Sequence, residues 1–173
     1  MEKSQQLPAK MFHILVIVLS FAVFPLPLSS QSPANPYELV VRKSKFRLDV
    51  MIGDSLIKTL PIALGKNPGD KIKRGDNRTP EGKFTIVQIQ KSGSWVHDFR
   101  DGKGEIAGAY GPWFLRLGSG ETRMKWMGIG IHGTHDPTSI GTLVSEGCIR
   151  VRNEQLEELR KLVKVGTPMT IIP

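Results

Sequence analysis

The residues best suited to covalent chemistry in this chain are a cysteine and a histidine that lie sixteen positions apart. Cys148 is the only cysteine, and His132 ends the apolar run 128–132. A thiol becomes a strong nucleophile when a neighbouring base accepts its proton, and that base needs a third group to hold its orientation. A histidine at the end of a strand, followed by Gly133, can be held by a nearby backbone carbonyl. The pair therefore predicts acyl transfer with Cys148 as nucleophile and His132 as base.

The residues around Cys148 favour a reactive thiol over a buried, inert one. Gly147 lets the backbone approach a substrate closely, and the adjacent N–H groups of Gly147 and Cys148 are suited to stabilising an oxyanion. Arg150 and Arg152 follow, and neighbouring guanidinium groups favour the thiolate. A secreted chain normally pairs its cysteines, so a single thiol in an exported protein indicates that the thiol is used.

Two alternatives use the same histidines. His135 competes with His132 as the base, although its surroundings are those of a loop residue. His132, His135 and Asp136 can also be considered as metal ligands. Their spacing matches no helix-borne His-Glu-x-x-His site, and no third cluster of ligands accompanies them, so we expect no metal.

The elements that must position these residues are mostly short strands. Glycine and proline are frequent (18 and 12 residues) and aromatic residues are few, which suits strands joined by turns better than a helical bundle. A long polar loop is expected at 66–82, and the Gly- and Ser-rich segment 91–111 is interpreted as a lid or an insertion. The strand-like patterns are 37–42, 45–52, 55–64, 83–90, 113–117, 127–132 and 167–172, and the first three resemble a meander. Within 45–52, Phe46, Leu48 and Val50 alternate and are expected on one face.

One helix is predicted shortly after Cys148. Asn153 is a favourable N-cap residue, and Gly166 is the expected stop. Apolar residues recur at helical spacing and should face the core: Leu156, Leu159 and Leu162 or Val163. A chain of 173 residues that is 39% hydrophobic can build one core but not two. We therefore expect a mostly-β single domain, a β-sandwich or barrel-like fold, with one short α-helix after the cysteine.

The first thirty residues differ from the rest of the chain. Lys3 and Lys10 precede the uncharged apolar run 14–24, and Pro25, Pro27 and small residues follow it. This order is typical of a signal peptide. A retained membrane anchor is the alternative, but a span needs about 20 apolar residues and the prolines interrupt this run too early. We expect residues 1–30 to be a signal peptide and the remaining domain to be exported to the periplasm or cell wall.

Positive charge dominates the rest of the chain. The formal net charge is +8, and removing residues 1–30, with two lysines and one glutamate, leaves +8 − 1 = +7. An exported basic protein has anionic polymers as candidate partners, among them wall glycan, teichoic acids, phospholipid headgroups and nucleic acid. No basic stripe interleaved with aromatic residues and no helix-turn-helix pattern is present, so nucleic acid is not expected. A membrane is expected only through an uncleaved N-terminal segment.

Several blocks of the sequence strongly resemble the YkuD-type L,D-transpeptidase catalytic domain. The resemblance covers residues 37–173, and its most specific part is the histidine block followed by the cysteine block. The matching blocks are Ala63-Leu64-Gly65-Lys66, Thr79-Pro80-x-Gly82-x-Phe84, His132-Gly133-Thr134, Ser139-Ile140-Gly141 and Ser145-x-Gly147-Cys148-Ile149-Arg150-x-x-Asn153.

This resemblance implies a role for each matching residue. Cys148 would be the nucleophile and His132 its base, oriented by a main-chain carbonyl around Gly133. The amides of Gly147 and Cys148 would form the oxyanion hole. Substrate contacts or shaping of the site would fall to Ser145 and Arg150.

The implied reaction is a two-step acyl transfer on the peptide stems of peptidoglycan. The thiolate attacks the carbonyl that joins the third residue of a tetrapeptide stem to its terminal D-Ala, and D-Ala leaves behind a thioester. The acyl acceptor is a neighbouring stem (a 3→3 cross-link), a lipoprotein lysine or a free D-amino acid. Two alternatives are an L,D-carboxypeptidase that uses water and a non-catalytic wall-binding module. No cofactor is needed, and carbapenems are the expected covalent inhibitors.

Other cysteine enzymes with a Cys–His pair fit the sequence less well. Papain-like and cell-wall endopeptidase families place the cysteine before the histidine, and sortases set the two much further apart. The chain does depart from the L,D-transpeptidase pattern at Glu146, where many members carry a histidine directly before the Gly-Cys pair. We expect this departure to alter oxyanion support or acceptor preference.

Overall fold

The computed structural model describes residues 35–100, 102, 104–118 and 128–173. The chain divides into two units, 1–32 and 33–173, and the description below concerns the second. The expected signal peptide at 1–30 lies outside the described residues and stays a prediction. Within the described ranges, no helix combines the length and the apolar character needed to cross a membrane.

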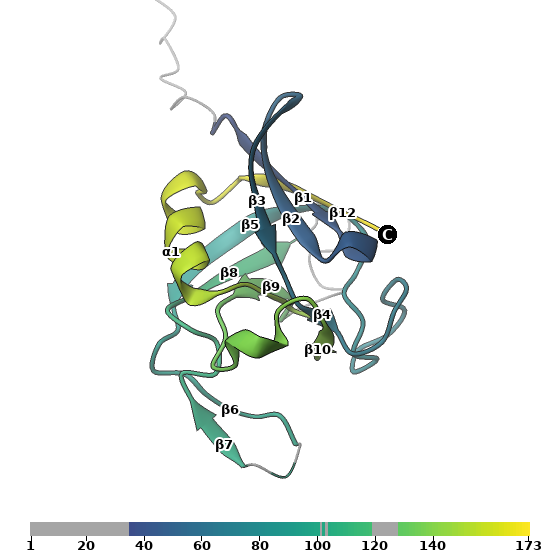
Figure 1. Cartoon of the computed structure of the whole chain (residues 1–173), viewed down its shortest axis with the longest axis vertical. Coiled ribbons are helices and arrows are strands. Elements are labelled where there is room, and N and C mark those ends of the chain that lie inside the picture. Colours follow the sequence, from purple (N-terminus) through teal and green to yellow (C-terminus); the bar gives the residue numbers. More distant parts are fainter. Residues whose placement is uncertain (1–34, 101, 103, 119–127) are drawn as a thin grey trace, which may run out of the picture. The chain divides into compact units, whose positions relative to one another are not determined.

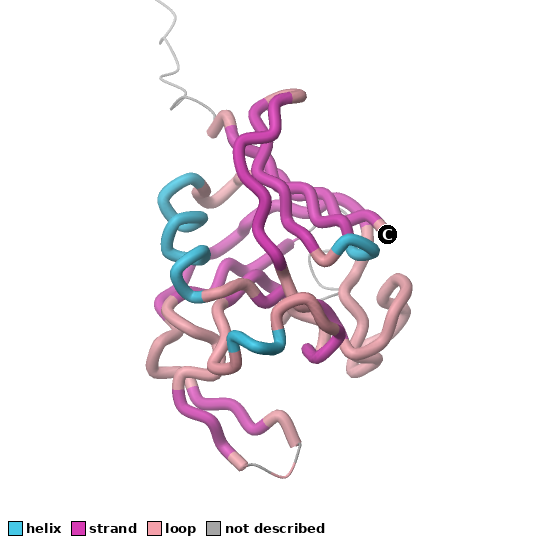
Figure 2. Tube along the Cα trace, in the orientation of Figure 1, coloured by secondary structure: helices cyan, strands magenta, loops and turns pink. Residues whose placement is uncertain are grey.

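The described part of the chain consists of short strands, one α-helix and two single-turn 3-10 helices (Figure 2). The helices are η1 (Lys43–Lys45), η2 (Pro137–Ser139) and α1 (Asn153–Leu162). The strands are β1 (Tyr37–Arg42), β2 (Arg47–Ile52), β3 (Ser55–Pro61), β4 (Leu64–Gly65), β5 (Gly82–Lys91), β6 (Val96–Asp98), β7 (Glu105–Ala107), β8 (Trp113–Gly118), β9 (Gly130–His132), β10 (Leu143–Ser145), β11 (Ile149–Arg150) and β12 (Pro168–Ile172).

Eight strands form one sheet in the order β11-β9-β8-β5-β12-β1-β2-β3 (Figure 1). The first three strands form an antiparallel meander, as the sequence predicts. Strand β12 lies between β1 and β5, parallel to β1 and antiparallel to β5. It therefore joins the amino-terminal meander to the strands that carry Cys148 and His132.

The sheet curls until its two edges meet. Beyond the end of β3, Ala63 exchanges two backbone hydrogen bonds of 2.9 Å with Arg150 of β11 at the opposite edge. Next to this bridge, β4 pairs in parallel with β10. The closure confirms the predicted mostly-β, barrel-like fold, and it places residues 63–65 beside the segment that carries Cys148.

The predicted strand 45–52 begins two residues late. Lys43–Lys45 forms a 3-10 turn instead, and Phe46 ends the turn in the left-handed region with φ 47°. The alternation that the sequence predicts for Leu48 and Val50 is present, and both side chains are buried in the core. Phe46 was expected on their face of the strand, but it packs against the core from the turn.

Helix α1 covers the sheet beside β8 (Figure 1). Leu156, Leu159 and Val163 are buried, as their spacing predicts. The predicted N-cap is wrong, because Arg152 holds that position and Asn153 is the first helical residue. The Asn153 side chain accepts a hydrogen bond from the Thr134 N–H at 2.9 Å, so it is committed to the segment after His132 and does not cap its own helix.

The expected strand 55–64 is interrupted after Pro61, and Leu64 begins the separate strand β4. The segment 91–111 is an insertion between β5 and β8 and contains the two-stranded hairpin of β6 and β7. The hairpin extends away from the large sheet in Figure 1. Its placement agrees with an insertion, while movement as a lid stays a prediction.

The buried face of α1 should contribute substantially to stability. We expect Leu156→Ala to lower the free energy of unfolding by about 2–5 kcal/mol, because it leaves a cavity at a fully buried position. Lys161→Ala, on the exposed face of the same helix, should change it by less than about 0.5 kcal/mol. Urea unfolding of both variants tests this, and equal losses would show that the helix does not depend on its core contact.

Candidate active site

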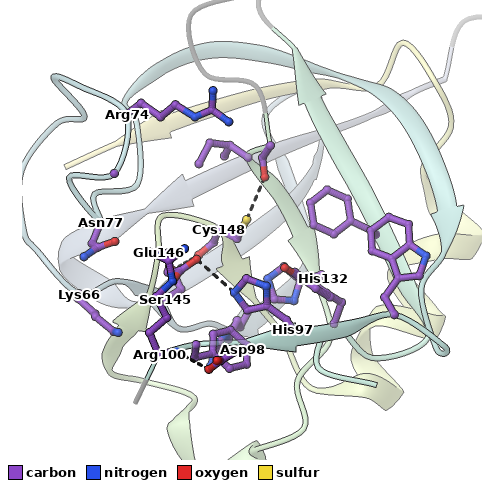
Figure 3. Close-up of a pocket in the computed structure, with 18 of the residues that line it drawn as sticks. Lys66, Arg74, Asn77, His97, Asp98, Arg100, His132, Ser145, Glu146 and Cys148 are labelled. Carbon is purple, nitrogen blue, oxygen red and sulfur yellow. Dashed lines mark hydrogen bonds and ion pairs between the residues drawn. The ribbon is translucent and has the colours of Figure 1, made fainter. Parts of the chain in front are cut away.

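Two neighbouring parallel strands, β9 and β11, bring the predicted dyad together. Arg150 in β11 lies opposite His132 in β9. Cys148 directly precedes β11, and its side chain lines the same cavity as those of Arg150 and His132. Its Sγ atom lies 3.4 Å from the Gly128 carbonyl oxygen. Figure 3 shows Cys148 and His132 on one cavity.

The cavity has a volume of about 840 Å³ and lies between two walls. One wall is the loop 66–81, with Lys66 and Arg74, and the other is the insertion 91–111, with His97 and Asp98 (Figure 3). Four of the predicted site residues line the cavity, namely Cys148, His132, Ser145 and Arg150. Gly133 and Gly147 are not among the lining residues, but the Gly133 carbonyl contacts His132 and the Gly147 N–H donates to Ser145.

The His132 ring is held on three sides. Its Nδ1 lies 2.7 Å from the Gly133 carbonyl oxygen, the main-chain contact that the sequence predicts. Phe114 stacks on the ring with centroids 5.6 Å apart, and Tyr110 meets it edge-on at 4.8 Å. When Nδ1 carries the ring proton and donates a hydrogen bond to this carbonyl, Nε2 keeps a free lone pair. The arrangement therefore suits His132 to accept a proton from a thiol.

The carbonyl that orients His132 is itself positioned by a tight backbone crossing. The Gly133 N–H donates to the Tyr110 carbonyl at 2.8 Å. A Cβ on Gly133 would lie 2.1 Å from Asn153 Oδ1 and 2.9 Å from the Gly111 Cα, and a Cβ on Gly111 would lie 2.6 Å from the Gly133 Cα. Only glycine fits at either position. Sequence reasoning missed Tyr110, Gly111 and the role of Asn153, although Asn153 was part of the matching cysteine block.

Ser145 fastens the loop that carries the cysteine. Its Oγ donates to the Cys148 carbonyl at 2.6 Å and accepts from the Gly147 N–H at 3.0 Å. Gly147 has φ 128°, and a Cβ there would lie 2.8 Å from the Arg78 carbonyl oxygen, so glycine is required. Because the Gly147 N–H is already engaged by Ser145, the Cys148 N–H is the remaining donor of the predicted oxyanion pair.

The thiol and the imidazole are both neutral in the resting site. Burial raises the pKa of Cys148 to about 11, although the guanidinium of Arg150 acts in the opposite direction. Burial, aided by the charge of Arg150, lowers the pKa of His132 to about 3. The guanidinium of Arg150 does lower the pKa of the Cys148 thiol, as expected from the sequence. Burial raises that pKa by more, so the thiol stays protonated at neutral pH. A thiolate at this position therefore has to form by loss of the thiol proton to a base.

The cationic wall formed by loop 66–81 is rigidly built. The carboxylate of Asp76 accepts from Lys71 Nζ at 2.6 Å and from the backbone N–H groups of Ile72, Lys73 and Arg78 at 2.8–3.1 Å. Burial alone would raise the pKa of Asp76, but these hydrogen bonds hold it well below its usual range. The loop thus keeps its shape through one buried carboxylate.

The alternative metal ligands have other partners. Asp136 accepts the N–H of Thr138 at 3.0 Å and caps the short helix η2. His135 is exposed and stacks on Phe99 with centroids 5.3 Å apart. Across the described ranges, no three His, Cys, Asp or Glu side chains gather into a metal site.

Comparison with known proteins places the chain in a family. The sequence profile of the YkuD L,D-transpeptidase catalytic domain matches residues 36–171. The chain belongs to this family. It is 34% identical over 138 residues to the protein named L,D-transpeptidase YkuD of Bacillus licheniformis, covering 80% of this chain and 67% of that one. The YkuD protein of Bacillus subtilis is 32% identical over 136 residues, covering 79% and 66%. The chain thus spans about two thirds of the length of these relatives.

Solved structures share the fold. An L,D-transpeptidase from Mycobacterium smegmatis superposes with a TM-score of 0.56 at 20% identity, covering 80% of this chain and 59% of that one. L,D-transpeptidase 3 from Mycobacterium tuberculosis, solved with a faropenem-derived adduct, gives a TM-score of 0.56 at 19% identity, covering 80% and 60%. These neighbours support the curled-sheet architecture of the L,D-transpeptidase fold.

The Asn153 side chain should be required for the geometry around His132. We expect Asn153→Ala to lower the free energy of unfolding by about 1–3 kcal/mol, because the buried Thr134 N–H loses its acceptor. Asn153→Asp keeps an acceptor oxygen and should lose less. Urea unfolding measures both variants, and an Asn153→Ala variant as stable as the wild type would show that the crossing holds without this bond.

The raised pKa of the Cys148 thiol predicts how its reactivity depends on pH. Because only the thiolate is alkylated, the rate of reaction with iodoacetamide should rise about tenfold per pH unit between pH 7 and 9. The same thiol in urea-unfolded chain should level off above its ordinary pKa of about 8.5. A rate in the folded protein that is flat across this range would instead indicate a preformed thiolate–imidazolium pair.

Proposed function

We propose that this chain is a peptidoglycan L,D-transpeptidase that forms a thioester on Cys148 and passes the acyl group to an amine. The main support for this proposal is that Cys148 and His132 line one cavity and that the Gly133 carbonyl orients the His132 ring. Family membership supports the reaction class. The choice of a tetrapeptide stem as acyl donor and of an amine as acceptor is also part of this proposal.

The first half-reaction follows from the neutral resting pair. Nε2 of His132 takes the thiol proton as Sγ of Cys148 bonds to the carbonyl carbon before the terminal D-Ala. The Cys148 N–H stabilises the oxyanion. As the carbon–nitrogen bond breaks, His132 returns the proton to the departing amino group of D-Ala, and a thioester remains.

The second half-reaction uses the same groups in reverse. An amine attacks the thioester carbonyl and gives its proton to His132, the carbon–sulfur bond breaks, and the Cys148 sulfur recovers the proton. The product is an amide, which is a 3→3 cross-link when the amine belongs to a neighbouring stem. Attack by water would instead give a carboxylic acid, the L,D-carboxypeptidase outcome.

The charge of the cavity supports an anionic peptide as the acyl donor. Six basic side chains line it and two acidic ones, so the cavity is cationic even with Lys71 paired to Asp76. A stem that ends in D-Ala carries a terminal carboxylate, which such a surface attracts. The basic lining residues are Lys66, Lys71, Arg74, Arg100, Arg116 and Arg150.

We further propose that the chain works outside the cytoplasm, with residues 1–30 acting as a signal peptide. The support is the order of basic residues, apolar run, prolines and small residues at 1–30. Substrates in the periplasm or cell wall require such export. The faropenem-derived adduct of the M. tuberculosis neighbour supports acylation of Cys148 by carbapenems and related β-lactams.

A defined tetrapeptide stem tests the function directly. We expect the purified wild-type chain to release D-Ala and to gain the mass of the acyl group, as seen by intact-protein mass spectrometry. Cys148→Ala should do neither. His132→Ala should be slower by about 100-fold or more, whereas His135→Ala, the matched loop histidine, should stay close to the wild type.

Each outcome separates the candidates. Release of D-Ala with an amide product identifies the transpeptidase, and release with a free acid alone identifies the carboxypeptidase. D-Ala release by Cys148→Ala would overturn the thioester mechanism. A folded wild-type chain that binds the stem without cleaving it would be a wall-binding module.

A further inference from the structure

The acidic groups of the cavity lie on one side of it. The acidic lining residues are Asp98 and Glu146, and Figure 3 shows both on the side of His97, away from Arg74. Asp98 is already engaged, since its Oδ1 accepts the Arg100 N–H at 2.7 Å. Glu146 is two residues before Cys148, and its side chain is 45% exposed. It is the carboxylate best placed to meet a second substrate.

The insertion 91–111 places a histidine beside this carboxylate. Nε2 of His97 lies 3.3 Å from Oε2 of Glu146, the contact drawn in Figure 3. The His97 ring is packed edge-on against Phe99 at 4.5 Å and against Tyr110 at 5.5 Å. Tyr110 also contacts the His132 ring, so one aromatic side chain packs against both the histidine beside Glu146 and the candidate base.

We propose that Glu146, which lies beside His97 at the rim of the insertion, binds the ammonium group of the acyl acceptor. This rests on the proposed function and names the acceptor class for the same site. Primary amines of the lysine type have a pKa near 10.4, so they arrive as cations. The cationic cavity repels such a cation, and a half-exposed carboxylate beside the thioester gives it a favourable position.

The bound cation still has to become a nucleophile. One proton of the ammonium passes to a solvent base, and the neutral amine then attacks the thioester carbonyl as described above. Its second proton goes to His132, and the Cys148 sulfur leaves the carbon and regains that proton. Other charged or titratable groups around Glu146 are His97, Tyr110, Cys148 and Arg150.

The test measures the two half-reactions of the full chain separately. Acylation is followed as release of D-Ala in a single turnover without amine. Aminolysis of the thioester is then measured at pH 7 with Nα-acetyl-lysine amide, an ammonium, and with hydroxylamine, which is uncharged at this pH. We expect Glu146→Gln to lower the second-order constant for the lysine acceptor by about five- to tenfold relative to hydroxylamine, through a higher KM.

Two further variants sharpen the result. Glu146→Asp keeps the charge and should recover part of the preference for the ammonium. Asp54→Asn removes one negative charge from an exposed turn that does not line the cavity, and it should leave the preference unchanged.

Equal losses with both amines in Glu146→Gln would overturn the inference, because Glu146 would then not recognise charge. Loss of preference in Asp54→Asn would also overturn it, since net charge would explain the effect. If the stem does not acylate the wild-type chain, no D-Ala is released. That outcome would contradict the proposed function, and not only the role of Glu146.

Discussion

The site depends on one place where two backbone segments cross with no side chain between them. Gly111 and Gly133 approach so closely that a Cβ on either would overlap the other segment. The crossing lets the Tyr110 carbonyl accept the Gly133 N–H. The next peptide, whose carbonyl oxygen lies 2.7 Å from His132 Nδ1, is held through the Thr134 N–H by the Asn153 side chain. The insertion, the strand β9 and the start of α1 are all joined at this point, since Asn153 closes it from the helix. The orientation of the base is therefore a property of the backbone.

Burial sets the electrostatic state of the dyad more strongly than neighbouring charge does. Arg150 stabilises the thiolate of Cys148 and disfavours a charged His132, but removal of the thiol from water outweighs the first effect and reinforces the second. A neutral pair avoids keeping two opposite charges where burial has removed part of their hydration. It also limits oxidation of the thiol, which proceeds through the thiolate. The chain can thus hold a single cysteine in a partly open cavity.

Local patterns in the sequence predicted most of the strands and the helix, and they singled out the cysteine and the histidine that line one cavity. Leu48 and Val50 alternate along a strand, and Leu156 and Leu159 have helical spacing. Each pattern marks a face that packs on the core, and the structure buries all four side chains. The sequence also predicted the main-chain contact of His132, because a histidine followed by glycine ends a strand.

Contacts between distant segments could not be predicted in the same way. Asn153 has the preferred residue type for an N-cap, yet its side chain bonds to Thr134, nineteen positions earlier. The Gly147 N–H, expected to face an oxyanion, is taken by Ser145 through a loop shape that residue types do not specify. The closure of the sheet at Ala63 and Arg150 likewise depends on how far the whole sheet curls.

The position of β12 has a consequence for how the domain is made. Leu39 pairs with Met169, so the strand that completes the middle of the sheet is synthesised long after the strand beside it. Until residues 168–172 have left the ribosome, β1 and β5 each present an unpaired edge, and edges of this kind invite pairing with other chains. Pairing over such a sequence distance is also slow. The nascent chain therefore has a long interval in which binding by a chaperone would protect it from aggregation.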